Sequence, residues 1–156
     1  MIGDMLKPEA VFLGVEVPDH KKKSALKTVS KLCAQYSGLK ENVLLKTFMG
    51  REKVESTGFG GGVAIPHAKM DHLEKPFIAI VRFAEPVEWD SIDGEPVKVA
   101  IALVMPRVDA DNTHLQVLSN FSRKLADDSF IEHILNDENP EELCSYIVEQ
   151  MGDESK

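Results

Sequence analysis

A histidine that directly follows a glycine-rich segment is the residue best suited to chemistry in this sequence. Four of the ten glycines fall at residues 58–62, and Val-Ala-Ile-Pro then leads to His67. This density predicts a loop with unusual backbone angles, whose N–H groups can face a phosphoryl group. The loop lacks the spacing of the Gly-x-Gly-x-x-Gly and P-loop nucleotide motifs. His67 is therefore a candidate functional residue; the alternative is a histidine that only ends a strand.

Two further side chains are candidates for the same site. His114 lies at a predicted helix start and shares a helical stripe with Leu118 and Phe121. A helix N-terminus disfavours an imidazolium and attracts an anion, although a half-buried histidine bonded to a carbonyl is an equally good interpretation. Arg51 ends a predicted helix, where it can complement the helix dipole. If the fold brings it to His67, its guanidinium can bind phosphoryl oxygens in a planar fork.

The remaining candidates favour ordinary structural roles. A zinc site would have to combine histidines from His67, His72, His114 and His133. These lack the usual zinc-ligand spacings, so we expect no metal. Cys33 and Cys144 fall on apolar helical stripes and are interpreted as core residues. Asp90 and Asp93 are either a carboxylate pair or turn residues.

Composition limits the class of protein. The 156 residues predict one domain, 1–156, and the formal net charge of −8 argues against binding to nucleic acid. No segment reaches about 18 consecutive apolar residues, so we expect no membrane insertion. The first eight residues have no apolar stretch of signal-peptide length, and two cysteines suit a reducing compartment. These features predict a cytoplasmic protein.

The elements that position the candidate residues follow from apolar periodicity. In the N-terminal half we expect a strand at 11–17, a helix at about 20–36 with Asp19 as its N-cap, and a helix at 40–51. Two almost continuously apolar strands, 77–83 and 97–105, indicate burial on both faces of a sheet.

The C-terminal third is predicted to be helical. Its helices are expected to begin with Thr113 as N-cap, at Ser129, and with Pro140 as first helical residue. Together these elements predict an α/β fold with a mixed sheet of about four to five strands, flanked by helices on both faces.

Two segments resemble one known family. Residues 51–67 read R-E-x-x-x-S-T-G-x-G-x-G-V-A-I-P-H, and D-G-x-P-V at 93–97 and T-H-L at 113–115 follow downstream. This pattern is similar to enzyme IIA of the fructose/mannitol class of the bacterial phosphotransferase system, which includes the nitrogen-regulatory IIA proteins. The resemblance covers about residues 10–150 and implies the type-2 enzyme IIA fold.

The resemblance also implies an activity. His67 would accept a phosphoryl group from the phosphohistidine carrier protein (HPr-like) and pass it to a cysteine of a IIB partner, with Arg51 and His114 in supporting roles. A membrane IIC component would be involved only indirectly. Such a transfer mainly needs positioning and charge stabilisation, so no cofactor is expected, and we expect phosphoryl-binding support from Thr57, Ser56 and Gly62.

Two functions and one surface remain as expectations. The protein either relays phosphate toward sugar uptake or uses the phosphorylation state of His67 to choose protein targets; residues 87–96 favour uptake. Because partners must reach His67, we also expect an exposed apolar rim formed by Phe59, Val63 and Met70.

Overall fold

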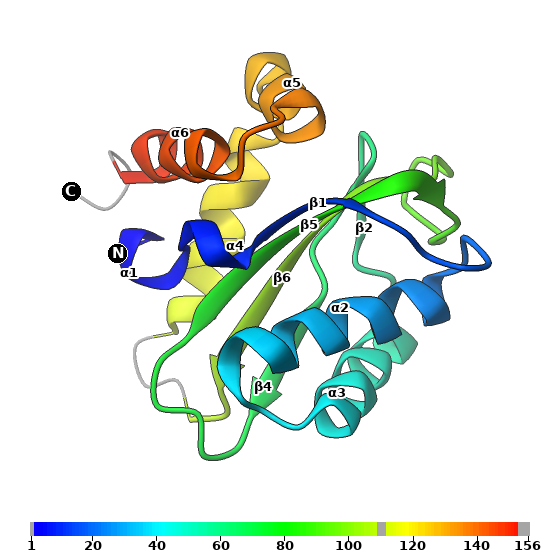
Figure 1. The fold of residues 1–156 in the computed structure, drawn as a ribbon, viewed down its shortest axis with the longest axis vertical. Coiled ribbons are helices and arrows are strands. Elements are labelled where there is room, and N and C mark those ends of the chain that lie inside the picture. Colours follow the sequence, from blue (N-terminus) through cyan, green and yellow to red (C-terminus); the bar gives the residue numbers. More distant parts are fainter. Residues whose placement is uncertain (1, 109–111, 153–156) are drawn as a thin grey trace.

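A mixed sheet runs through the middle of the molecule, with helices on both faces (Figure 1). The computed structural model describes residues 2–108 and 112–152, so the outermost ends of the predicted 1–156 domain lie outside it. The strands are β1 (Val11–Val15), β2 (Gly58–Gly60), β3 (Val63–Ala64), β4 (His67–Met70), β5 (Phe77–Val87) and β6 (Val97–Pro106). The helices are α1 (Ile2–Met5), the 3₁₀ turn η1 (Pro8–Ala10), α2 (Lys22–Ser37), α3 (Glu41–Val54), α4 (Thr113–Lys124), α5 (Asp128–Asn136) and α6 (Pro140–Gly152).

The described sheet has six strands in the order β1-β5-β6-β3-β2, and β4 also pairs with β6. β5 and β6 are antiparallel, whereas β1 is parallel to β5, and β3 and β4 are parallel to β6. The predicted α/β class and mixed sheet are confirmed. The strand number exceeds the expected four to five, because the short strands β2, β3 and β4 form within residues 58–70, where the sequence analysis predicted a loop and assigned no strand.

Both faces of the sheet are buried, as the continuous apolar strands predicted. Alternate residues of β5 point to opposite faces, so Ile78 and Ile80 join one core cluster and Ala79 and Val81 join the other. The first cluster also contains side chains of α1, α4, α5 and α6, and the second contains side chains of α2 and α3. The sheet is therefore the middle layer between two helical layers (Figure 1).

Several helix starts differ from the prediction by one or two residues. α2 begins at Lys22, because His20 has a left-handed φ of 56° and Asp19 accepts a hydrogen bond from the Lys21 N–H at 3.1 Å. Asn112 is the N-cap of α4, so Thr113 is its first helical residue.

Helix α5 begins one residue before the predicted position, and α6 begins where it was predicted. α5 begins at Asp128, where the N-cap Asp127 accepts from the Ser129 N–H. The prediction for α6 is confirmed: Pro140 is its first residue, and the Asn139 side chain accepts from the Glu142 N–H at 3.0 Å.

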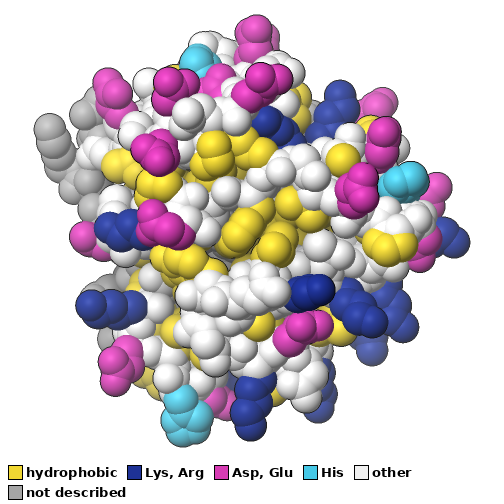
Figure 2. Space-filling model, in the orientation of Figure 1, with side chains coloured by type: hydrophobic (Ala, Val, Ile, Leu, Met, Phe, Trp, Pro, Cys, Tyr) yellow, Lys and Arg dark blue, Asp and Glu magenta, His cyan; other side chains and the backbone are white. Residues whose placement is uncertain are grey.

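β1 forms one edge of the sheet, since it pairs only with β5. Phe12 pairs with Val81 and Val15 pairs with Phe83, so β1 has one residue more than β5 between the two pairs. Gly14, which lies within this irregularity, has a φ of +69°. Figure 2 shows apolar side chains across the middle of the face that carries β1, among acidic and basic ones. None of the helices in the described part of the chain is long and apolar enough to cross a membrane.

Candidate functional site

The structure brings Arg51 to His67. Arg51 lies in the last turn of α3, which packs beside β4, and His67 is the first residue of β4. The Arg51 Nε–H donates to His67 Nε2 at 3.0 Å, and Arg51 Nη1 donates to the Glu55 carbonyl at 2.6 Å. Two hydrogen bonds therefore aim the guanidinium at one ring nitrogen of a half-buried histidine.

These contacts determine the protonation state of His67. Its Nδ1 lies 2.8 Å from the Ile65 carbonyl oxygen, which only accepts hydrogen bonds, so the proton is on Nδ1. Nε2 must then use its lone pair to accept from Arg51. Pro66 restricts Ile65 to an extended conformation. The ring is therefore neutral, with its basic nitrogen facing the guanidinium.

The electrostatics of the site agree with a neutral ring. Burial lowers the pKa of His67 below its ordinary value of 6.5, and the charges of Arg51 and His114 lower it further. The Ile65 carbonyl and the Glu52 carboxylate act in the opposite direction. Arg51 contacts His67 directly, and His114, in the first turn of α4, contributes to the lowered pKa of the same ring.

We expect the NMR titration midpoint of His67 to lie below 6.5. Because the folded protein favours the neutral ring, the stability that this ring contributes is fully present above about pH 6.5 and is lost as pH falls through the lowered midpoint. Ring chemical shifts assigned by comparison with His67→Gln would measure the midpoint. A midpoint at or above 6.5 would contradict the burial of the neutral ring.

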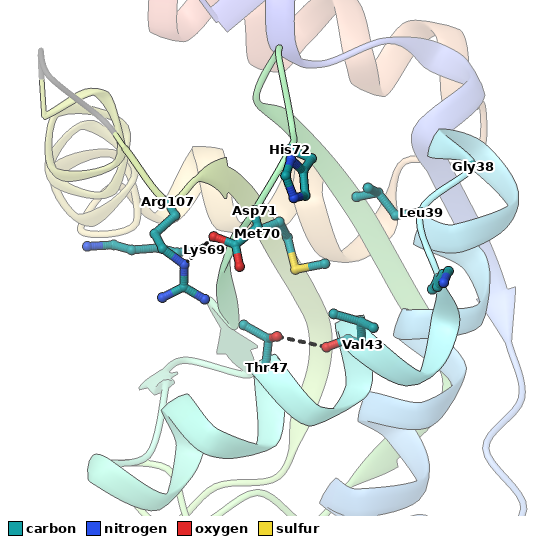
Figure 3. A pocket seen from close by; sticks show the side chains of 10 residues that line it. Gly38, Leu39, Val43, Thr47, Lys69, Met70, Asp71, His72 and Arg107 are labelled. Carbon is teal, nitrogen blue, oxygen red and sulfur yellow. Dashed lines mark hydrogen bonds and ion pairs between the residues drawn. The ribbon is translucent and has the colours of Figure 1, made fainter.

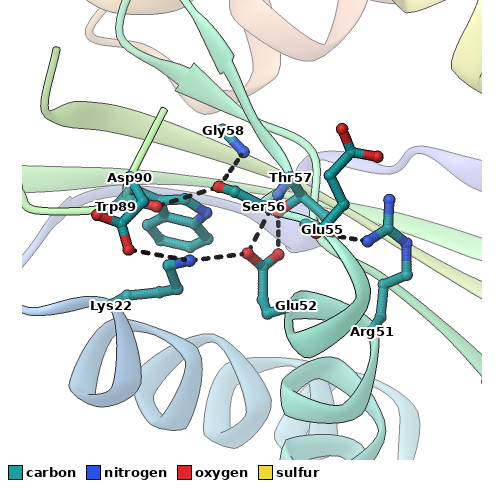
Figure 4. Close-up of polar contacts among 9 residues, drawn as sticks. All are labelled: Lys22, Arg51, Glu52, Glu55, Ser56, Thr57, Gly58, Trp89 and Asp90. Atoms are coloured by element: carbon teal, nitrogen blue, oxygen red, sulfur yellow. Dashed lines mark hydrogen bonds and ion pairs between the residues drawn. The ribbon is translucent and has the colours of Figure 1, made fainter. Parts of the chain in front are cut away.

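The segment before the glycine loop is held against residues 89–91 (Figure 4). The Ser56 hydroxyl donates to the Trp89 carbonyl at 3.1 Å and accepts from the Gly58 N–H at 3.1 Å. A Cβ at Gly58 would lie 2.7 Å from the Ser91 Cα, so only glycine fits this position without a backbone shift. Ser56 thus acts in the structure as a connector between two loops.

The glycine loop itself is tied to the sheet and to the 93–94 turn. Gly62 has a φ of +86°, and its carbonyl accepts from the Lys98 N–H at 2.7 Å. The Gly61 N–H donates to Asp93 at 2.9 Å, and the same carboxylate accepts from Glu95 at 3.0 Å. Of the two interpretations of Asp93, these contacts support the turn residue.

Thr57 and Glu52 form a buried contact that the sequence analysis did not anticipate. Glu52 is 8% exposed, and its carboxylate accepts from both the N–H and the hydroxyl of Thr57. It also accepts from Lys22 at 3.1 Å (Figure 4). The Thr57 hydroxyl proton is therefore directed at Glu52 in this structure. The sequence feature that could have indicated a role for Glu52 is its position next to Arg51 in the 51–67 motif.

A separate pocket lies at the Met70 end of β4, whereas His67 is at the start of that strand. Figure 3 shows the side chains that line the pocket. It has a volume of about 330 Å³, and its lining includes Met70, Val43 and Arg107. The Arg107 Nε–H donates to Asp71 at 2.6 Å, so the most strongly basic group of the lining is already paired. Among the described residues, no three His, Cys, Asp or Glu side chains gather as a metal site would require.

A family model matches almost the whole chain. Residues 4–150 match the family described as "Phosphoenolpyruvate-dependent sugar phosphotransferase system, EIIA 2". The chain belongs to this enzyme IIA family.

Two similar proteins are named for nitrogen regulation. A "Nitrogen regulatory protein" of Klebsiella oxytoca is 36% identical over 129 residues, which cover 82% of this enzyme IIA and 79% of the relative. The crystal structure of "Nitrogen Regulatory Protein IIA-Ntr" from Neisseria meningitidis is 33% identical, with a TM-score of 0.84, and covers 92% of this chain and 97% of that one.

A third similar structure is the complex of enzyme IIAMTL and phosphorylated enzyme IIBMTL from Escherichia coli. It is 19% identical to this enzyme IIA, with a TM-score of 0.73, and the match covers 96% of this chain and 99% of that chain. At this identity the likeness shows the shared fold. The predicted family and fold are thereby confirmed.

The predicted apolar rim of this enzyme IIA is largely wrong. Val63 is 0% exposed and Met70 is 4% exposed, because β3 and β4 pair with β6 and direct both side chains into the core. Phe59 is 37% exposed, as expected for an exposed apolar residue of the rim. Leu115, which follows His114 in α4, is 53% exposed and was not anticipated.

Proposed function

We propose that this enzyme IIA is a phosphoryl carrier. His67 accepts a phosphoryl group from a phosphohistidine carrier protein (HPr-like) and passes it to a cysteine of a IIB partner, in the cytoplasm. The observation that carries this proposal is the Arg51–His67 contact at 3.0 Å, with the ring proton held on Nδ1 by the Ile65 carbonyl. A neutral imidazole with a directed lone pair is the nucleophile that the reaction needs.

The two transfers follow from this geometry. The His67 Nε2 lone pair attacks the donor's phosphorus, a new P–N bond forms, and the donor's own P–N bond breaks, leaving its histidine neutral. The cysteine thiolate of IIB then attacks the same phosphorus, a P–S bond forms, and the His67 P–N bond breaks. In both steps the Nδ1–H bond to Ile65 stabilises the positive charge that the phosphorylated ring carries.

The neighbouring residues have distinct proposed roles. When the Nε2 lone pair is used for bonding, the Arg51 Nε–H donates instead to a phosphoryl oxygen. A guanidinium held in place in the protein stabilises this anion more strongly than a cation in water does. His114, at the N-terminus of α4, stabilises the same anion together with the helix dipole. Thr57, Ser56 and Gly62 support the site by holding the loop in place.

The acceptor distinguishes the two uses of such a carrier. The complex of a IIA with a phosphorylated IIB, among proteins of this fold, supports a IIB acceptor, and the family's description as a sugar phosphotransferase system supports transfer toward sugar uptake. In that use a IIC component would be involved only through IIB. The similarity to nitrogen regulatory proteins at 36% and 33% identity supports the second candidate, a regulator whose phosphorylation state controls binding to protein targets.

A two-stage transfer assay tests both candidates. The protein is incubated with the phosphorylated carrier protein, and the label is located by peptide mass spectrometry under conditions that preserve P–N bonds. The labelled protein is then mixed with IIB domains of several sugar classes. We expect label on His67 followed by its appearance on a IIB cysteine. Label that no IIB removes would support the regulator, and an unlabelled His67 would overturn the carrier.

A further inference from the structure

Glu52 is a buried carboxylate next to the candidate site, and its partners lie at the start of α2 and in the segment between α3 and β2. It belongs to the last turn of α3, its side chain is 4% exposed, and Lys22 from the start of α2 lies 3.1 Å away. Asp90 is 3.9 Å from the same ammonium but is 94% exposed, so it contributes little. A buried carboxylate is stable only when it is paired and hydrogen-bonded. Lys22 and Thr57 meet that requirement.

A chain of hydrogen bonds leads from Glu52 to the ring of His67. The Thr57 N–H donates to Glu52 at 3.1 Å, and the Thr57 carbonyl accepts from the Ile65 N–H at 3.0 Å. The Ile65 carbonyl in turn accepts from His67 Nδ1 at 2.8 Å. Each hydrogen bond holds one part of the 57–65 segment in place. The position of Ile65 at the ring therefore depends on the position of Thr57 at the Glu52 carboxylate.

The same helical turn also directs Arg51. Arg51 and Glu52 are successive residues of α3 whose side chains reach different partners, the Glu55 carbonyl for Arg51 and Thr57 for Glu52 (Figure 4). Their contacts hold the chain on both sides where it leaves the helix. Rotation of this turn would therefore displace the guanidinium and the ring support together.

We propose that the Lys22–Glu52 ion pair positions the imidazole of His67 through Thr57 and Ile65, which makes Glu52 a positioning residue for phosphoryl transfer. This inference rests on the proposed carrier function. The Glu52 charge also acts directly on the ring, since it raises the pKa of His67 against the lowering by burial, Arg51 and His114. The carboxylate thus keeps the nucleophilic nitrogen more basic in an otherwise cationic neighbourhood.

Two pairs of variants test the inference. Glu52→Gln removes the charge but keeps the size, and Glu41→Gln removes a charge from the opposite end of α3 as its control. Thr57→Val removes the hydroxyl contact with Glu52, and Thr57→Ser, which keeps a hydroxyl, is the conservative variant that should restore function. The measurements are the rate of phosphoryl transfer, the ¹⁵N shifts and titration midpoint of the His67 ring, and the melting temperature.

We expect Glu52→Gln to slow transfer by about tenfold or more, because displacement of a reacting group by about 1 Å can cost about 100-fold. The His67 midpoint should fall, and its ring shifts should show less of the Nδ1–H form. Thr57→Val should slow transfer, Thr57→Ser should retain more of the rate than Thr57→Val, and Glu41→Gln should leave the rate close to that of the unchanged protein.

The outcomes separate this inference from the carrier function. A Glu52→Gln protein with a lower melting temperature but an unchanged midpoint, ring spectrum and rate would overturn the positioning role. If that variant does not fold, equal rates for Thr57→Val and Thr57→Ser would overturn it instead. The ring measurements need no phosphoryl donor, so a failure of the unchanged protein to accept phosphate would refute the carrier function alone.

Discussion

Replacing His67 by glutamine is expected to abolish phosphoryl acceptance and leave the fold intact. Glutamine has no nucleophilic nitrogen, and neither Arg51, which is permanently protonated, nor Glu52, which is buried, can replace the ring. The backbone pairing of His67 with Leu103 of β6 does not depend on the side chain. The loss of the two ring hydrogen bonds should cost about 1–3 kcal/mol of unfolding free energy.

The experiment compares His67→Gln with His72→Gln, a change of the same type at an exposed residue just beyond β4. Labelling by the phosphorylated carrier protein and thermal unfolding are measured on both. Only the first variant should lose its label, and both should unfold cooperatively. Label that persists in His67→Gln would place the acceptor elsewhere.

Exchanging Arg51 for lysine is expected to slow phosphoryl transfer by about 100-fold or more, although the charge is unchanged. The guanidinium contacts His67 through Nε and the Glu55 carbonyl through Nη1, two directions that one ammonium cannot serve together. Removal of one directed donor from a developing anion costs about 10²–10³ in rate in other enzymes.

Arg107→Lys is the matched control, because Arg107 forms an exposed ion pair with Asp71 beyond the far end of β4. Single-turnover transfer rates from the phosphorylated carrier protein would be measured for both variants. A rate for Arg51→Lys that equals the control would remove the directed guanidinium from the mechanism.

The parts of the fold that depend on local pattern were predictable from the sequence. The almost continuous apolar character of 77–83 and 97–105 anticipated strands covered on both faces, since their apolar side chains alternate between the two core clusters. Pro140 marked the first residue of α6, because proline needs no N–H partner there. The motif at 51–67 likewise identified the two residues that meet in the site, His67 and Arg51.

The parts that depend on distant pairing were not predictable. Val63 and Met70 looked suitable for a rim, but their burial is decided by the register of β3 and β4 against β6, about 35 residues later in the chain. Apart from its place in the 51–67 motif, Glu52 reads as an ordinary charged helix residue. Its burial depends on Lys22, 30 residues earlier, and on a chain reversal that turns Thr57 back onto it.

The irregular strand β1 has a consequence for how copies of the protein meet. An edge strand with partly buried Phe12 and Leu13 offers unpaired backbone groups to the strand of another molecule. The extra residue at Gly14 breaks the even spacing of those groups, so a second strand cannot continue the ladder along the full edge. The irregularity thereby limits the length of edge available to a second strand, as bulges do on the edge strands of other sheets.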